Sequence, residues 1–284
     1  MSGQGTGGGR IALYSGEGEL PSYLAEEGRA TGVDLVVYGI DGLYAQNLKP
    51  DAVFGLGEVG RMKRQMKADK VERVVFSGRF YRPDYAAVAW DAGGVAMLPK
   101  ILKTRIGGDD STSRAISSIV DSWGLSLAGP LDIAPSFAAT SGALSRKKPT
   151  RVQSEDIAFG FDVVAGLGAF DIGQAIIVHD RRILAVEAAE GTDLMIERIS
   201  TLRANGRLRV KVPSGILVKT AKPGQEMRMD MPVIGSDTVR KAAESGLAGI
   251  AIAAGEVLLA TPNAVREEAE RAGIFVAGIA RDAV

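Results

Sequence analysis

The chain has 284 residues, more than one domain usually holds, and 46% of them are hydrophobic, enough for one large core or two ordinary ones. It contains no cysteine, which excludes disulfide bonds, thiolate metal sites and cysteine nucleophiles and agrees with a reducing, cytoplasmic compartment. The 34 basic and 34 acidic side chains cancel, so we expect no nucleic-acid partner. No apolar run approaches the roughly 18 residues that a membrane-spanning helix needs.

The first nine residues, MSGQGTGGG, lack the basic flank and the apolar core of a signal peptide. We expect residues 1–9 to be a disordered lead-in or a cloning remnant, with the folded protein starting near Arg10.

Residues 10–133 alternate short β-branched runs with helical stretches, as in a parallel sheet covered by helices. The pattern predicts a Rossmann-like N-terminal domain with the following elements. Strands are expected at 10–14, 34–38, 51–55 and 73–77, and helices at 21–29, 58–67 and 109–123.

The pattern dissolves into Pro, Ala, Ser, Thr and Gly after residue 130, which indicates a linker over residues 134–152. Residues 153–284 are then expected to form a second α/β domain. Its predicted strands are 174–179, 183–188, 215–220, 248–253 and 274–276, and its predicted helices are 154–167, 192–202, 237–245 and 263–272. We expect a turn at Asp180-Arg181-Arg182 between the first two of these strands.

Two glycine-containing loops each follow a predicted strand and open a helix, where backbone N–H groups favour an anion. In the first loop, Gly16 and Gly18 are candidate substrate contacts, although a tight turn explains them equally well. Pro21 displaces the third glycine of a dinucleotide fingerprint. The second loop, residues 55–60, leads into a basic helix.

Positive charge is concentrated between Gly57 and Ile106, a segment with eleven basic and five acidic residues and therefore a surplus of six positive charges. The basic side chains of the predicted helix 58–67 usually form a face that water solvates. The alternative is that they contact an anionic substrate or lipid headgroups. Apolar residues in the same region could assist binding to an anionic membrane. They are Trp90, Met97, Leu98, Ile101 and Leu102.

Carboxylates and their neighbours are denser in the second half, at strand ends and in the loops beyond them, where α/β folds place ligands. Oxygen ligands of this kind suit Mg²⁺ or Mn²⁺, which would neutralise phosphate charge and position water. The candidates are Asp171, Gln174, Glu187, Glu190, Thr192, Asp193, Lys219, Lys222, Gln225, Asp230 and Asp237.

Ordinary structural roles compete with these assignments. Thr192 and Asp193 could cap a helix, Glu187 could pair with a lysine, and we interpret Asp237 as a helix cap. His179, the single histidine, is assigned a structural role, and this excludes the histidine-rich dinuclear metallophosphatases as a candidate class. No Gly-x-Ser-x-Gly elbow and no Walker-type loop occurs, so serine hydrolases and P-loop NTPases are set aside.

Several motifs of the second half form a recognisable set. They are Asp171-Ile-Gly-Gln174, Glu187-Ala-Ala-Glu190-Gly-Thr-Asp193, Val218-Lys219, Lys222-Pro-Gly-Gln225 and Asp230-Met-Pro-Val-Ile-Gly235. Together they resemble the LpxI-type UDP-2,3-diacylglucosamine pyrophosphatases of lipid A biosynthesis, and the resemblance spans almost the whole chain. The first loop, Tyr14-Ser-Gly-Glu-Gly-Glu19, departs from the family pattern.

The resemblance implies a hydrolase with two domains joined by a linker, which cleaves UDP-2,3-diacylglucosamine to UMP and 2,3-diacylglucosamine 1-phosphate with the aid of Mg²⁺. By motif match, Asp230 is the expected catalytic carboxylate, and Asp230 with Glu190 the expected metal ligands. Gln174, Thr192, Lys219 and Lys222 are expected to contact metal or phosphate. A lipid substrate implies work at the cytoplasmic face of the inner membrane, and a homodimer stays open.

Two other hypotheses remain. The strand, glycine loop and helix at the N-terminus suggest an NAD(P)-dependent oxidoreductase, and a non-catalytic nucleotide-sugar or lipid-binding protein would use the carboxylates only as caps and pairs.

Overall fold

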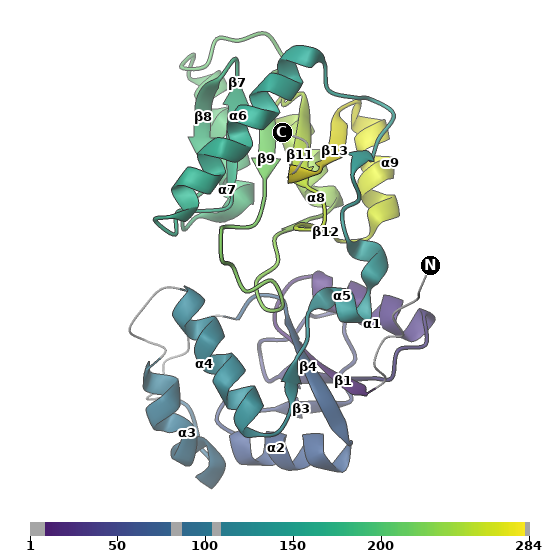
Figure 1. Ribbon diagram of the computed structural model, residues 1–284, viewed down its shortest axis with the longest axis vertical. Helices are drawn as coiled ribbons and strands as arrows, with labels where there is room; N and C mark the ends of the chain where they lie inside the picture. Colours follow the sequence, from purple (N-terminus) through teal and green to yellow (C-terminus); the bar gives the residue numbers. More distant parts are fainter. Residues whose placement is uncertain (1–8, 81–86, 104–108, 282–284) are drawn as a thin grey trace. The chain divides into compact units, whose positions relative to one another are not determined.

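The computed structural model describes residues 9–80, 87–103 and 109–281, so the expectation for residues 1–8 lies outside the described part. The chain forms two compact α/β units (Figure 1). The first consists of residues 1–135 and 226–230, and the second of residues 136–225 and 231–284. The segment 226–230 therefore belongs to the first unit although it lies late in the sequence.

The first unit contains a parallel five-stranded sheet with the order β3-β2-β1-β4-β5, as a Rossmann-like domain requires. Its strands are β1 (Arg10–Ser15), β2 (Leu35–Ile40), β3 (Ala52–Phe54), β4 (Val71–Ser77) and β5 (Ser126–Leu127). Its helices are α1 (Leu20–Ala30), α2 (Val59–Ala68), α3 (Ala92–Lys103), α4 (Asp109–Ser122) and α5 (Pro130–Ile133).

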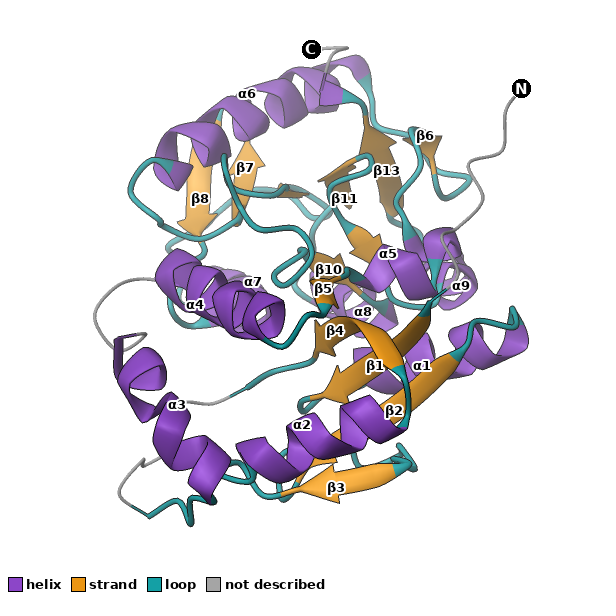
Figure 2. Ribbon diagram, turned by 60° about the horizontal axis from the view of Figure 1, so that its bottom comes forward, coloured by secondary structure: helices purple, strands orange, loops and turns teal. Residues whose placement is uncertain are grey.

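Both faces of this sheet are buried, which is why its strands read as continuous apolar runs. Tyr14 and Tyr38 lie on the face that packs against Met66 of α2 and Val120 of α4. Leu13 precedes Tyr14 in β1, so its side chain points to the opposite face of the sheet, and it is fully buried as well. Helix α3 contacts both α2 and α4 (Figure 2). The sequence pattern did not predict α3, which contains Pro99.

The second unit is built on a six-stranded mixed sheet with the order β6-β13-β11-β9-β7-β8. Its strands are β6 (Gly142–Ala143), β7 (Ala175–His179), β8 (Arg182–Val186), β9 (Ile216–Lys219), β11 (Gly249–Ala253) and β13 (Phe275–Ile279). A separate parallel pair joins β10 (Val233–Ile234) to β12 (Leu258–Leu259). Its helices are α6 (Arg151–Gly168), α7 (Gly191–Ala204), α8 (Ser236–Glu244) and α9 (Pro262–Ala272).

Side chains alternate between two cores of the second unit, as the pleat of a strand dictates. Ile177 and Leu217 pack with Met195 of α7 and with residues of α8 and α9. Ile176 and Val218 pack on the opposite face against α6, whose ribbon crosses β7 and β8 in Figure 2. The second unit is therefore a three-layer α/β/α arrangement.

Residues 134–152, predicted as a linker, contain a 3-10 turn (Pro135–Phe137) and strand β6, which pairs with β13. Helix α6 begins three residues earlier than expected, because Thr150 and Gln153 form a capping box.

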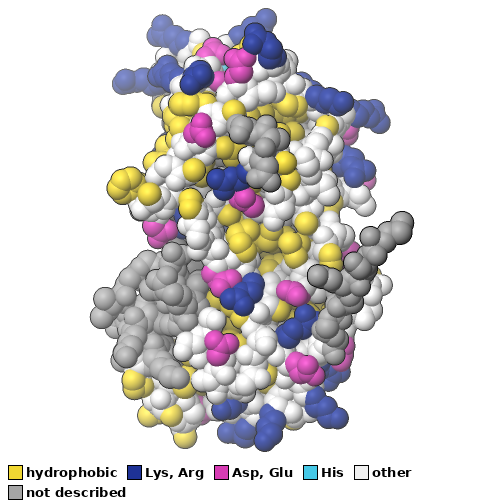
Figure 3. Space-filling view, viewed as in Figure 1, with side chains coloured by type: hydrophobic (Ala, Val, Ile, Leu, Met, Phe, Trp, Pro, Cys, Tyr) yellow, Lys and Arg dark blue, Asp and Glu magenta, His cyan; other side chains and the backbone are white. Residues whose placement is uncertain are grey.

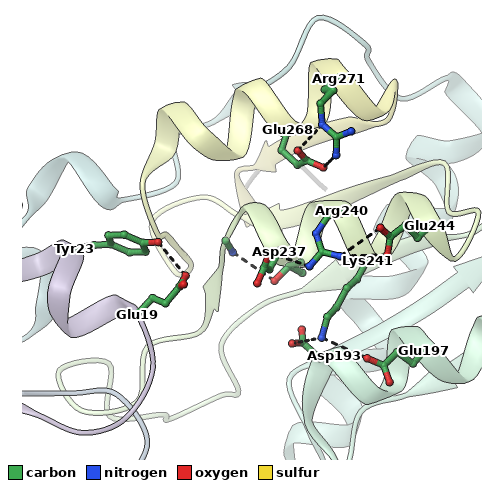
Figure 4. Close-up of polar contacts among 12 residues, drawn as sticks. Glu19, Tyr23, Asp193, Glu197, Asp237, Arg240, Lys241, Glu244, Glu268 and Arg271 are labelled. Atoms are coloured by element: carbon green, nitrogen blue, oxygen red, sulfur yellow. Dashed lines mark hydrogen bonds and ion pairs between the residues drawn. The ribbon is translucent and has the colours of Figure 1, made fainter. Parts of the chain in front are cut away.

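Two local expectations are wrong. The N-cap of α8 is Gly235, and Asp237 instead forms an ion pair of 3.1 Å with Arg240 one turn later (Figure 4). The turn between β7 and β8 contains only Asp180 and Arg181, both with positive φ, and Arg182 is already in β8.

Among the described residues, no helix combines the length and the apolarity that crossing a membrane requires.

Candidate active site

The centre of the candidate site is a buried polar chain in the second unit that joins Glu187, Thr192 and Lys219. Glu187 and Lys219 are only 6% and 5% exposed. The hydroxyl of Thr192 donates to Glu187 Oε1 over 2.7 Å and accepts from Lys219 Nζ over 2.9 Å. Lys219 Nζ also donates to the carbonyl of Val233 over 3.0 Å. Buried charges need such partners, so the three side chains hold one another in fixed positions.

Sheet topology explains why these residues meet. Strands β8 and β9 both run antiparallel to β7, which lies between them, so β8 and β9 end at the same edge. Glu187 follows β8, Lys219 ends β9, and Gln174 precedes β7 at this edge. The first turn of α7 brings Thr192 to the same place.

Gln174 and Lys222 extend the same network. The N–H of Gln174 donates to Glu187 Oε2 over 3.2 Å, and its side-chain oxygen accepts from Gln225 Nε2 over 3.2 Å. Gln225 in turn accepts the N–H of Lys222 over 2.8 Å, while the Lys222 side chain pairs with Asp171. The structure thus brings Gln174, Thr192, Lys219 and Lys222 together, as the sequence suggested for a single site.

The neighbouring glycine makes this edge compact. Gly173 has a φ of 51°, and a Cβ at this position would lie 2.1 Å from the carbonyl oxygen of Glu187. Any side chain there would displace the loop that carries Glu187.

Glu190 lies outside this network. It occupies the N-cap position of α7 without making a side-chain cap, and its Oε1 lies 3.1 Å from Nη2 of Arg198 as an ion pair. That oxygen is buried and accepts no hydrogen bond from any described residue. A metal cation could use this oxygen in place of the Arg198 guanidinium.

Asp230 is exposed and belongs to segment 226–230 of the first unit. Its N–H donates to the carbonyl of Glu226 over 3.0 Å. The Arg228 guanidinium clamps the Glu226 carboxylate at 2.6 and 2.8 Å, and its hydrogen bonds lower the pKa of Glu226. Asp230 and Glu190 thus belong to different units, and their joint role as metal ligands stays a prediction.

The two glycines of the first loop differ in role. A Cβ at Gly16 would lie 2.6 Å from the carbonyl oxygen of Arg79, so this glycine allows two chain segments to approach. Gly18 has a φ of 103° and lines a pocket of about 780 Å³. The charged side chains that line this pocket are all carboxylates, which opposes an anion there. They belong to Glu17, Glu19, Glu26 and Asp41. Glu19 accepts the Tyr23 hydroxyl over 2.9 Å (Figure 4).

The second glycine loop already holds an anion of the protein itself. Asp91 accepts the N–H groups of Gly60 and Arg61 at the start of α2, over 3.0 and 2.9 Å, and that of Gly94 over 2.7 Å. A Cβ at Gly57 would lie 2.2 Å from the carbonyl oxygen of Ala89. The glycines therefore let the two segments pack, and the helix N-terminus is occupied by Asp91.

One group of side chains outside the predicted set could hold a metal ion. Asp156, His179 and Asp180 place one ligand atom each within 4.8 Å of one another. Both oxygens of Asp156, however, accept backbone N–H groups of the β7–β8 turn, from Asp180 over 2.9 Å and from Arg181 over 2.7 Å. Asp156 therefore also supports the β7–β8 turn, in which Asp180 and Arg181 both have positive φ.

Nearly the whole chain matches models of the two domains of one family. Residues 10–137 match the LpxI N-terminal domain, and residues 140–277 match the LpxI C-terminal domain. A curated protein from Caulobacter vibrioides, named UDP-2,3-diacylglucosamine pyrophosphatase LpxI, is 34% identical over 272 residues, which cover 95% of this chain and 97% of that protein. The resemblance drawn from the motifs is thereby confirmed, and this chain belongs to the LpxI family.

Proposed function

We propose that this protein hydrolyses the diphosphate bond of UDP-2,3-diacylglucosamine in lipid A biosynthesis. The observation that carries the proposal is the Glu187–Thr192–Lys219 network, at the edge of a sheet, in a chain that matches the curated LpxI relative over nearly its full length. Positive charge held in place at a buried position is suited to a phosphate whose charge increases during reaction.

In the proposed reaction, the oxygen of water forms a bond to the α-phosphorus. The bond between the α-phosphorus and the bridging oxygen breaks, and that oxygen leaves with the sugar 1-phosphate. The products are UMP and 2,3-diacylglucosamine 1-phosphate. Lys219 and Lys222 are the proposed contacts of the diphosphate, with Gln174 and Thr192 orienting it.

Asp230 has two alternative roles in this scheme. As general base it takes the proton from water, whereas as a metal ligand it leaves that proton to solvent. Carboxylates are the ligands that Mg²⁺ and Mn²⁺ prefer, and Oε1 of Glu190 accepts no hydrogen bond from a described residue although it pairs with Arg198. Each of these two carboxylates, Glu190 and Asp230, is proposed as a ligand of the ion, which when bound would neutralise charge on phosphate oxygens.

Isotope transfer tests the reaction directly. The purified protein is incubated with synthetic UDP-2,3-diacylglucosamine in ¹⁸O-water, either with Mg²⁺ or with excess chelator. The masses of the products are then measured by mass spectrometry. Attack at the α-phosphorus places one ¹⁸O in UMP, and chelator is expected to stop turnover. Label in the sugar phosphate would contradict the site of attack, and binding without turnover would identify a non-catalytic binding protein.

We also propose that the protein works peripherally at the cytoplasmic face of the inner membrane, with helix α2 toward anionic lipid. Arg61, Lys63, Arg64 and Lys67 are all exposed on α2. Figure 3 shows Lys and Arg side chains over the end of the first unit where α2 lies. Of the apolar residues expected to assist, Met97 and Leu98 are half-buried, and the side chains of Ile101 and Leu102 lie outside the description.

Vesicle sedimentation tests this placement. Vesicles with anionic lipid are expected to bind the protein less as salt rises, since exposed charges are screened within about 10 Å at 0.1 M salt. Reversing two charges of α2 (Lys63→Glu with Lys67→Glu) should reduce binding, whereas a matched reversal in the second unit (Arg207→Glu with Lys211→Glu) should not. Equal effects of the two double variants would contradict the role of α2. Sedimentation velocity of the same samples tests for a homodimer.

A further inference from the structure

The first unit contains an apolar pocket that the network in the second unit does not use. Its volume is about 160 Å³, and it lies between the sheet and helices α2, α3 and α4. Its wall is formed by aromatic, branched aliphatic and methionine side chains, including Phe76 from β4, Met62 from α2, Met97 from α3 and Trp123 after α4. An apolar cavity of about 150 Å³ in a protein core stays dry and accepts small apolar molecules, so this pocket suits a hydrocarbon group better than water.

One polar atom in this wall has no partner. Tyr14 lines the pocket and is 2% exposed, and its hydroxyl forms no hydrogen bond with any described residue. A buried hydroxyl without a partner is costly, and natural proteins rarely leave one unless a ligand or an ordered water completes it.

The ring of Tyr14 cannot easily swing away to find a partner elsewhere. It stacks on Phe76 with ring centroids 5.4 Å apart, and it meets Tyr38 edge to face at 5.3 Å. Burial, and to a smaller extent the charge of Tyr38, raise the pKa of Tyr14, so its hydroxyl keeps its proton and can donate.

We infer that this pocket receives one acyl chain of the substrate, with the Tyr14 hydroxyl bonded to an oxygen that the chain carries. The inference rests on the proposed function, because the name of the curated relative specifies a sugar with two acyl groups. Methionines suit such a wall, since their flexible side chains adapt to the shape of a hydrocarbon. The occupant is therefore an apolar chain with at least one carbonyl or hydroxyl oxygen.

Trp123 offers a direct reading of occupancy. The chain has only two tryptophans, Trp90 and Trp123, so Trp90→Phe leaves the pocket residue as the single indole. This variant of the full chain is titrated with 10-bromodecanamide, whose bromine quenches fluorescence on contact, and with 1-bromodecane, which has no oxygen. We expect saturable quenching by both probes.

Three further substitutions in the same background locate the bound chain. Val59→Phe fills the pocket from α2 and should abolish saturable quenching, while Val95→Phe, at an exposed position of α3 outside the pocket, should leave it unchanged. Tyr14→Phe should weaken 10-bromodecanamide by about tenfold, as expected for one lost hydrogen bond, and leave 1-bromodecane unchanged. Absence of saturable quenching, or equal behaviour of Val59→Phe and Val95→Phe, would overturn the inference.

Competition in the Trp90→Phe protein needs no pocket variant that could misfold, and it separates this inference from the proposed function. UDP-2,3-diacylglucosamine should displace the bromo-amide, and UDP-glucosamine without acyl chains should not. Displacement without turnover would leave the acyl pocket standing and remove the hydrolase proposal. Turnover without displacement would support the hydrolase proposal and reject the acyl pocket. Displacement by UDP-glucosamine as well would also reject the acyl pocket.

Discussion

Thr192 donates its hydroxyl proton to the buried carboxylate of Glu187 across 2.7 Å, which leaves the Thr192 oxygen free to accept from Lys219. A single hydroxyl thus separates a buried negative charge from a buried positive one. Such an arrangement keeps both side chains satisfied without a direct ion pair between them.

Removing this hydroxyl should damage both stability and turnover. Thr192→Val keeps the shape but leaves Glu187 and Lys219 each short of one hydrogen bond, which should cost about 1–3 kcal/mol in the free energy of unfolding. Thr192→Ser should retain most of the stability. Urea unfolding measures the first effect and kcat/KM the second, with Thr201→Val, at an exposed position of the same helix, as control. A Thr192→Val protein as active as the wild type would separate this network from the chemistry.

Asp230 should matter for turnover and not for folding. Its side chain is exposed, so Asp230→Asn should leave the urea midpoint unchanged while it lowers kcat by at least about 100-fold, the size typical of losing a catalytic acid or base. Asp237→Asn is the matched control, because Asp237 is also exposed and pairs with Arg240 of its own helix. Near-normal kcat in Asp230→Asn would remove Asp230 from the chemistry. Metal titration by calorimetry then assigns its role, since loss of binding identifies a ligand and retained binding a base.

Much of the fold followed from local patterns in the sequence. The β-branched run 174–179 and the loops that flank it predicted β7 and the position of Gln174 before it. Strand ends gather at sheet edges, and therefore the grouping of Gln174, Thr192, Lys219 and Lys222 could be expected before the pairing of β7, β8 and β9 was known. The Thr150 and Gln153 capping box is a local sequence signal for the start of α6, three residues before the start that hydrophobic periodicity predicts.

Other features depend on contacts between distant parts of the chain. Asp91 caps a helix that begins about thirty residues earlier, which no local motif announces. The membership of residues 226–230 in the first unit is a tertiary property of the same kind, as is the unpaired hydroxyl of Tyr14. Helix α3 went unpredicted because glycines and Pro99 weaken its helical pattern.

The Asp91 cap should make stability depend on pH. Burial raises the pKa of Asp91, but the hydrogen bonds from Gly94, Gly60 and Arg61 outweigh burial, and the pKa of the folded form lies below its ordinary value. A lowered folded pKa means that the stabilisation is present above the unfolded pKa of about 3.9 and is lost as pH falls through the folded value.

Asp91→Ala should therefore cost about 1 kcal/mol near neutral pH, the usual worth of a helix cap. The difference from the wild type should begin to shrink below about pH 4, where the carboxylate of the unfolded chain takes up its proton, and it should vanish once the pH falls below the lower folded pKa. Urea unfolding followed by circular dichroism at several pH values measures this difference. If the wild type and Asp91→Ala differed by the same free energy of unfolding at every pH down to the lowest at which both stay folded, the carboxylate charge would contribute nothing to stability.

The Asp156, His179 and Asp180 group allows turn support and metal binding to be told apart. Asp156→Ala removes the acceptor of two N–H groups in a turn with φ values of 49° and 56°, so it should lower the free energy of unfolding by about 1–3 kcal/mol. His179→Gln should have little effect on stability. Because both Asp156 oxygens already accept backbone N–H groups, we expect the Mg²⁺ dependence of turnover to be unchanged in His179→Gln, measured as the metal concentration for half-maximal rate. A large rise in that concentration would instead move the metal to this turn and away from Glu190 and Asp230.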